Sequence, residues 1–234
     1  MKKRIRINGI VIFVSIIITV LFAYKIFRQE NTLMDDFLEM VGIILILMGQ
    51  LVRVSSRGYK SELSNSGHSL ITDGPYSMVR NPMYLGIVLI GTGIILSVFQ
   101  LWVFVIFIFG FCALYIRLIV KEEKNLLEVF GERYLEYKKA VPRLFPGFSF
   151  LLKTDTQRYL PLRFSWIKRE SLSIILVLFL VLLVESWEVV GMQGWHILIG
   201  ELAKFSLIII SFFILVIFLS QRYENLAKES KNHK

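Results

Sequence analysis

Two polar segments of this chain carry side chains suited to holding a small charged molecule. The segment 57–82 ends in Arg80, Asn81 and Pro82, and the segment 121–150 begins with Glu122 and Glu123. Paired carboxylates favour a cationic ligand, whereas a guanidinium and an amide can hold a polar tail. Proline interrupts the backbone at a helix start, where exposed amides bind a carboxylate. These residue types together predict a site for a cationic cofactor.

Aromatic rings accompany the charged residues. Tyr76 and Tyr84 can offer their ring faces to an aromatic base or to a cation, and a cation–π contact contributes about 0.5–2 kcal/mol. Taken alone, Glu122 and Glu123 have a simpler interpretation as the acidic first turn of a solvated helix. His196 and His233 show no partner spacing, and no metal site is predicted.

Apolar runs of about twenty residues surround these segments and must position them. Of the 234 residues, 55% are hydrophobic and only 19% are charged, below the ~25% that is usual in soluble domains. Such runs are long enough to cross a ~30 Å hydrocarbon core as helices. The sequence therefore predicts an all-α integral membrane protein of about six spans. These are residues 7–27, 37–52 or 37–56, two spans within 83–120, and residues 171–190 and 197–220.

The third and fourth spans form a hairpin with a turn near residues 96–102. A hairpin returns its chain to the side that it left, so segments 57–82 and 121–150 are expected to meet. The spacing of Leu126, Phe130, Tyr134 and Tyr137 predicts an amphipathic helix that Pro142 and Pro146 end. We expect two N-terminal spans in 1–56, a catalytic core in 57–150, and a connector with two further spans in 151–234.

The basic residues predict the orientation in the membrane. Of 27 Lys and Arg residues, 24 fall on the side that holds both termini and the two polar segments. Basic loops stay in the cytoplasm, so both termini and the active site are expected on the cytoplasmic side. The membrane itself is expected to be the cytoplasmic membrane of a bacterium or archaeon. The same bias explains the net charge of +9 without a nucleic acid partner.

The two polar segments resemble the isoprenylcysteine carboxyl methyltransferases and the related phospholipid methyltransferases. The signature of that family is G-x-Y, R-H-P-x-Y-x-G, a helical hairpin, E-E-x-x-L, F-G-x-x-Y-x-x-Y and a P-R-x-x-P-like end. The corresponding stretches here, in the same order, are 74–76, 80–86, 122–126, 130–137 and 142–146. The resemblance covers about residues 60–147.

The resemblance implies S-adenosylmethionine as the methyl donor. It implies cofactor contacts at His68, Ser69, Leu70, Ile71, Tyr76, Asn81, Pro82, Met83, Tyr84 and Glu122, with Glu123 as the paired acid. Arg80, Asn81, Glu122 and Arg117 are the residues expected to serve catalysis. Asn81 replaces a histidine of the eukaryotic pattern, which keeps a hydrogen-bonding side chain but removes titration near neutral pH. Arg117 lies one position from the family arginine that is implicated in contacting substrate.

We therefore expect methyl transfer to a lipophilic acceptor that enters from the bilayer. Carboxyl O-methylation of a prenylcysteine-like or other lipid substrate is the first expectation. Phospholipid N-methylation and S-methylation of a small thiol are alternatives within the same chemistry. Two further alternatives are a sterol-reductase-like enzyme that uses NADPH and a membrane protein without enzymatic activity.

Overall fold

A computed structural model describes residues 26–27, 33–64, 69–147, 159–193 and 195–232. The predicted first span, residues 7–27, lies outside the described residues except for its last two. The described residues contain no β-strand, only an isolated bridge between Phe27 and Phe99. The predicted all-helical class is therefore confirmed for this part of the chain.

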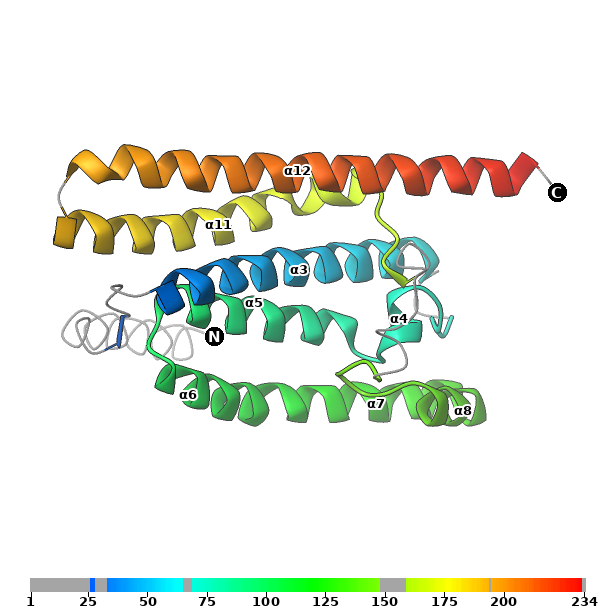
Figure 1. Cartoon of the computed structure of the whole chain (residues 1–234). Coiled ribbons are helices and arrows are strands. Elements are labelled where there is room, and N and C mark those ends of the chain that lie inside the picture. The colour runs from blue at the N-terminus through cyan, green and yellow to red at the C-terminus, as the bar shows by residue number, and fades with distance from the viewer. Residues whose placement is uncertain (1–25, 28–32, 65–68, 148–158, 194, 233–234) are drawn as a thin grey trace, which may run out of the picture.

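Helices follow one another along the described chain, and the long ones alternate in direction (Figure 1). They are α3 (Leu33–Leu63), α4 (Pro75–Met78), α5 (Pro82–Val98), α6 (Trp102–Phe111), a π-helical turn (Cys112–Ile116), α7 (Arg117–Phe130), α8 (Glu132–Ala140), α11 (Phe164–Gln193) and α12 (Trp195–Asn232). In Figure 1 they lie in the order α12, α11, α3, α5 and α6–α7 from top to bottom. The short helices α4 and α8 lie at one end of this stack.

Glycines let α3 and α5 approach closely along their length. A Cβ atom added at Gly49 would lie 2.7 Å from the Gly86 carbonyl oxygen, and one added at Gly93 would lie 2.5 Å from the Gly42 carbonyl oxygen. Small residues at helix contacts are typical of membrane proteins, where close packing rather than water drives association. This contact fixes the start of α5, which carries Asn81 and Tyr84, against the C-terminal half of α3.

Among the residues that the structure describes, three helical segments are long and apolar enough to cross a membrane: Leu33–Leu63, Trp102–Phe130 and Phe205–Tyr223. Helix α5 is a shorter apolar helix. The predicted membrane character is thus confirmed, whereas the number of six spans and the cytoplasmic orientation stay predictions. The predicted hairpin turn is confirmed as well, since α5 ends at Val98 and α6 begins at Trp102.

Several boundaries differ from the sequence prediction. Helix α3 continues to Leu63, through the first residues of the predicted polar loop, because its last turns dock on α11. The fourth span and the amphipathic helix are continuous from Trp102 to Phe130. That helix ends at Gly131, whose φ of +54° is a left-handed conformation that glycine adopts without strain, and α8 follows. Helix α11 begins at Phe164 rather than Ser171.

Candidate functional site

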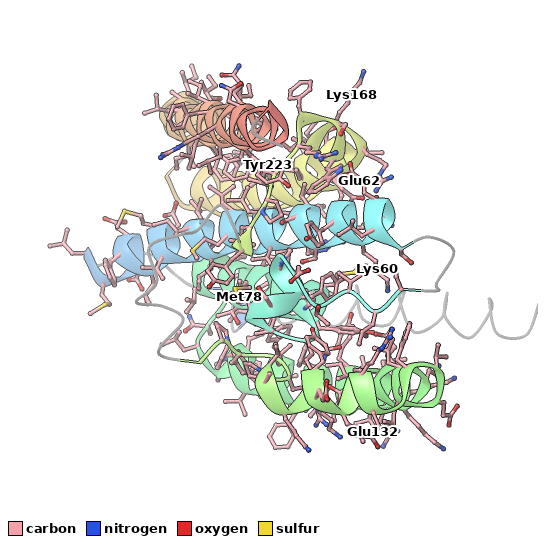
Figure 2. All side chains as sticks on the ribbon, turned by 90° about the vertical axis from the view of Figure 1, so that its right-hand side faces the viewer. Lys60, Glu62, Met78, Glu132, Lys168 and Tyr223 are labelled. Carbon is pink, nitrogen blue, oxygen red and sulfur yellow. The ribbon has the colours of Figure 1, made fainter. Side chains whose placement is uncertain are left out.

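The two polar segments meet at one end of the helix stack. The Arg80 amide donates to the Pro142 carbonyl oxygen at 2.8 Å, and the Asn81 amide donates to the Arg143 carbonyl oxygen at 3.1 Å. Figure 2 views the molecule from this end, with α4, labelled at Met78, between the last turns of α3 and helix α8. The expected meeting of the two segments is thus observed.

The first segment reaches this place through a tight turn. Gly74 has a φ of +59° and precedes Pro75, the first residue of α4. Helix α4 ends at Met78, the following Val79 is extended, and Asn81 then precedes Pro82 at the start of α5. The Tyr137 hydroxyl donates to the Tyr76 carbonyl oxygen at 2.6 Å and so ties α8 to α4.

Glu123 is buried at the centre of the contact between the segments, with 6% of its surface exposed. Arg143 donates to both of its carboxylate oxygens, with Nη2 2.9 Å from Oε2 and Nε 3.2 Å from each oxygen. The Nε of Arg80 lies 3.3 Å from Oε1 as an ion pair. Asn81 Nδ2 donates to Oε1 at 3.3 Å and to the Arg143 carbonyl oxygen at 3.0 Å. The negative charge of Glu123 is therefore balanced by two guanidinium groups, and its carboxylate is hydrogen-bonded within the protein.

Glu122 is exposed, in contrast to its neighbour. Its Oε1 accepts a hydrogen bond of 2.9 Å from the Tyr84 hydroxyl, in the first turn of α5. The Tyr84 ring lies edge-on to Tyr115, at 5.6 Å between centroids, and Tyr115 stacks on Phe111 at 4.8 Å. An aromatic column thus runs from Glu122 along α6. Of the acidic pair, Glu122 is the carboxylate that a ligand can reach.

The tyrosines around the two acids stay neutral at physiological pH. Burial raises the pKa of Tyr76, and the nearby Glu122 carboxylate raises that pKa further. Burial also raises the pKa of Tyr137, next to Tyr76 and Tyr134. The hydrogen bonds to Glu123 raise the pKa of the Arg143 guanidinium, which keeps it charged beside the buried acid. The site therefore holds a fixed exposed carboxylate and neutral phenols.

The structure brings most of the expected residues to this end of the molecule. Tyr76, Asn81, Pro82, Met83, Tyr84, Glu122 and Glu123 lie there, and Leu70 and Ile71 are half-buried in the approach to α4. Ser69 is exposed and donates to the Leu63 carbonyl oxygen at the end of α3. Arg117 is exposed at the start of α7, more than a turn before Glu122. His68 lies outside the described residues.

Two expected ligand residues instead serve internal contacts. The Arg80 side chain is 8% exposed, pairs with Glu123 and donates from Nη1 to the Lys138 carbonyl oxygen. Asn81 is similarly engaged with Glu123 and Arg143. The interpretation from sequence did not single out Arg143, although this residue stands in the P-R-x-x-P-like stretch. Within the described residues, no group of His, Cys, Asp and Glu could hold a metal ion.

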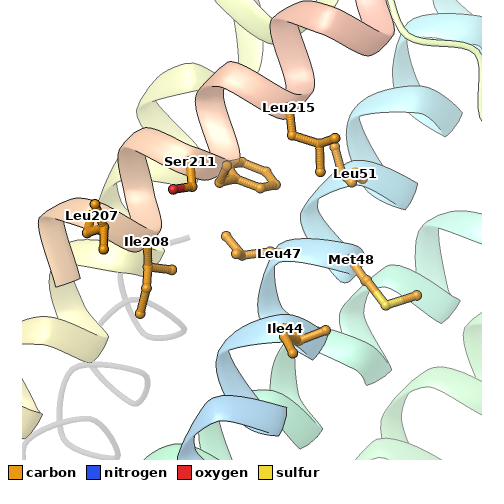
Figure 3. A pocket seen from close by; sticks show the side chains of 9 residues that line it. Ile44, Leu47, Met48, Leu51, Leu207, Ile208, Ser211 and Leu215 are labelled. Carbon is orange, nitrogen blue, oxygen red and sulfur yellow. The ribbon is translucent and has the colours of Figure 1, made fainter. Parts of the chain in front are cut away.

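A cavity of about 380 Å³ lies elsewhere, between α3 and α12 (Figure 3). Its lining residues are Ile44, Leu47, Met48, Leu51, Leu207, Ile208, Ser211, Phe212 and Leu215. Ser211 is the one polar residue among them, and no charged side chain lines this cavity. Its chemistry suits apolar chains rather than a charged cofactor.

Comparison with known proteins links the site to methyltransferases. Residues 37–133 match the phospholipid methyltransferase family. The chain is 31% identical to the protein-S-isoprenylcysteine O-methyltransferase of Xenopus laevis over 51% of its length and 46% of that protein. It is 33% identical to the enzyme of the same name from Saccharomyces cerevisiae, over 43% of the chain and 46% of that protein. The resemblance predicted from the motifs is thereby confirmed.

A further relative is named for metal resistance and not for methyl transfer. The chain is 27% identical to the cobalt-zinc-cadmium resistance protein of Cupriavidus metallidurans, over 59% of its length and 62% of that protein. The chain spans about half the length of the two methyltransferases that it matches. No solved structure matches it significantly.

Proposed function

We propose that the chain catalyses methyl transfer from S-adenosylmethionine to a lipophilic acceptor at the end of the helix stack where the two polar segments meet. The observation that carries the proposal is the separation of the acidic pair. Glu123 is paired with Arg80 and Arg143 and hydrogen-bonded to Asn81. Glu122, in contrast, is exposed beside Tyr84 at the start of α5. The family match and the names of two relatives support the same chemistry.

The residues present fit the charged part of this methyl donor. The Glu122 carboxylate would receive its ammonium group. The N-cap residue Asn81 makes no capping hydrogen bond with its side chain, and the positive end of the α5 dipole would favour the carboxylate of the methyl donor. Tyr76 and Tyr84 would offer ring faces to the adenine or the sulfonium. When bound, S-adenosylmethionine supplies a methyl group that its sulfonium has already activated.

A carboxyl acceptor would suit the surroundings of the site. An α-carboxyl group has an ordinary pKa of about 3.3–3.7 and is ionised at pH 7, so no side chain has to remove a proton. The contribution of this chain is then to hold the two reactants in line and to exclude water, and positioning of this kind is a large source of rate acceleration. Prenylcysteine is the acceptor class that the names of two relatives support.

The apolar surroundings favour an acceptor that arrives from the bilayer. Helix α5 leads from the polar site directly into an apolar span, and α6 presents exposed apolar side chains such as Val105, Ile106 and Phe109. A charged cofactor and an apolar acceptor would each be penalised in the other's medium, so separate entrances are expected. Phospholipid amines and small thiols remain the alternative acceptors for the same cofactor site.

Ligand titration of the purified protein tests the proposal. We expect S-adenosylmethionine and S-adenosylhomocysteine to bind, and NADPH not to bind, since the exposed Glu122 repels a phosphate and Arg80 is already paired. Binding of NADPH alone would instead support a reductase on the same scaffold. Binding of none of the three ligands by folded protein would contradict the proposal.

A further inference from the structure

Helix α11 docks on the last turns of α3 through buried and charged contacts. The Trp166 indole nitrogen donates to Glu62 Oε1 at 2.6 Å, and Arg163 pairs with Glu62 Oε2 at 2.7 Å. The buried Ser55 hydroxyl donates to the Pro161 carbonyl oxygen at 2.7 Å. Glu62 and Lys168 label these neighbouring helices in Figure 2. Residues 159–232 lie beyond the family match that ends at residue 133, yet this end of α11 is firmly attached to α3.

The Trp166 ring fills the space next to Gly58. A Cβ atom at Gly58 would lie 2.1–2.5 Å from the ring, so only glycine permits this contact. The ring is 4% exposed and lies edge-on to the neighbouring Tyr59, with 6.5 Å between the ring centroids. The position of the Tyr59 ring therefore depends on the docking of α11.

A second neighbour of the Tyr59 ring is the turn that begins α4. A Cβ atom at Gly74 would lie 2.9–3.1 Å from three carbons of the ring. Gly74 is buried and left-handed, and its carbonyl oxygen accepts hydrogen bonds from the Ser77 amide and hydroxyl at 3.1 and 2.7 Å. Tyr59 thus lies between α11 and the turn from which α4 and the Arg80–Asn81 stretch follow.

We propose that Tyr59 is a positioning residue for the methyl-transfer site, because it transmits the docking of Trp166 on α3 to Gly74 and so holds α4 and the start of α5. The proposal rests on the proposed function and extends it to the C-terminal helix pair. Helix α4 is only four residues long and has little stability of its own, so its position has to come from contacts with its neighbours. Contacts from Tyr59 on one side and Tyr137 on the other hold it.

Hydrogen exchange of the full-length protein without ligand tests the mechanical part of the proposal. In Tyr59→Leu and in Trp166→Leu, we expect peptides that cover residues 74–81 to exchange at least several-fold faster than in the unchanged protein. Tyr59→Phe keeps the ring and should restore slow exchange. Arg57→Ala is the matched control, because it removes the exposed ion pair between Arg57 and Glu170 on the same two helices and leaves the ring contacts in place.

Titration with S-adenosylmethionine then tests the consequence for the site. Its Kd should rise several-fold in Tyr59→Leu and Trp166→Leu but not in Tyr59→Phe or Arg57→Ala. Unchanged exchange over residues 74–81 in Tyr59→Leu, or faster exchange with an unchanged Kd, would overturn the proposal. If Tyr59→Leu unfolds throughout, Trp166→Phe takes its place with the same two criteria. If the unchanged protein binds no S-adenosylmethionine, the proposed function fails, whereas the exchange comparison still decides whether Tyr59 holds the turn.

Discussion

At the scale of single residues, the acidic pair divides into one internal and one external carboxylate. Consecutive residues of a helix are about 100° apart, so a helix lying on a surface can bury one and expose the next. Glu123 meets two guanidinium groups and an amide, which offset the cost of removing its charge from water. Glu122 presents its carboxylate at the surface and accepts a hydrogen bond from the Tyr84 hydroxyl. The two neighbours therefore have different expected roles.

Substitution of Glu122 should affect the ligand and spare the fold. We expect Glu122→Gln to weaken the binding of S-adenosylmethionine by about 1.5–3 kcal/mol, the scale of a hydrogen bond to a charged group, which is about 10- to 150-fold in Kd. Because the side chain is exposed, the free energy of unfolding should change by less than ~0.5 kcal/mol. Calorimetric titration measures the first quantity. An unchanged Kd in the folded variant would mean that the acidic pair serves only the fold.

Substitution of Glu123 should have the opposite profile. Glu123→Gln leaves the buried Arg80 guanidinium without its partner, and the loss of one member of a buried ion pair typically costs about 3–5 kcal/mol. Since Arg143 is half-exposed and can turn to water, we expect a loss of unfolding free energy near the lower end, about 3 kcal/mol. Chemical unfolding in mixed micelles measures it. A stability equal to that of the unchanged protein would show that the buried pair contributes nothing.

The sequence indicated which residues form the site, but not which of them pair with one another and which a ligand can reach. The motif order identified Arg80, Asn81 and the acidic pair, and the structure brings them together. That Arg80 and Asn81 bind Glu123 depends on the hydrogen bonds of their backbone amides to the Pro142 and Arg143 carbonyl oxygens, which no local sequence pattern reveals. Arg143 lies twenty residues from Glu123, so their pairing is a tertiary contact that spacing alone does not reveal.

At the scale of elements, the α3–α5 contact sets the position of the site. Gly42 and Gly49 of α3 are seven residues apart, as are Gly86 and Gly93 of α5, and they meet reciprocally across the antiparallel pair. Seven residues are close to two helical turns, so each pair lies on one face of its helix. The absence of side chains brings the backbones together and fixes the first turn of α5 relative to α3.

A methyl group in this contact should disrupt it. In Gly49→Ala the new Cβ would lie 2.7 Å from the Gly86 carbonyl oxygen, so we expect the free energy of unfolding to fall by about 1–3 kcal/mol, as for other overpacked sites. Gly110→Ala is the matched control in α6, where a Cβ meets nothing within 4 Å and helix propensity alone should add up to about 1 kcal/mol. If the two variants unfold alike, the close contact is not what limits stability.

Element boundaries were predictable where local chemistry decides them. The turn after Val98 and the end of the second polar helix before Pro142 followed from the sequence. The break at Gly131 did not, because an isolated glycine within a helical pattern is usually tolerated and only its φ of +54° reveals the turn. The extension of α3 to Leu63 depends on the Trp166 contact at Gly58, a tertiary effect.

At the scale of the whole molecule, the helices place all of the described polar segments at one end. The end of α3, the starts of α5 and α11, and helices α4 and α8 lie together in Figure 1, and the turns from α5 to α6 and from α11 to α12 lie at the other end. The described parts of segments 57–82 and 117–150, which were expected on the side rich in basic residues, lie at this end. Basic loops remain in the cytoplasm, so this end is expected to face it.

Cysteine labelling tests that orientation. In a Cys112→Ala background, a cysteine at Lys139 of α8 should react only with reagents on the cytoplasmic side. A cysteine at Gln193, the last residue of α11, should react from the opposite side. The measurement uses a membrane-impermeant maleimide on intact cells and on inverted vesicles. Labelling of both positions from the same side would contradict the proposed orientation.

The central claim is that this end of the molecule transfers a methyl group to a lipophilic carboxylate. Its most direct test is incubation of the protein in lipid vesicles with methyl-labelled S-adenosylmethionine and an S-farnesylated cysteine, alongside the corresponding carboxamide. We expect the labelled methyl group to appear in a base-labile methyl ester of the carboxylate and not in the carboxamide. The rate of methyl transfer should be lower in Glu122→Gln. Protein that binds S-adenosylmethionine but leaves the carboxylate unlabelled, or that yields a base-stable product, would contradict the claim.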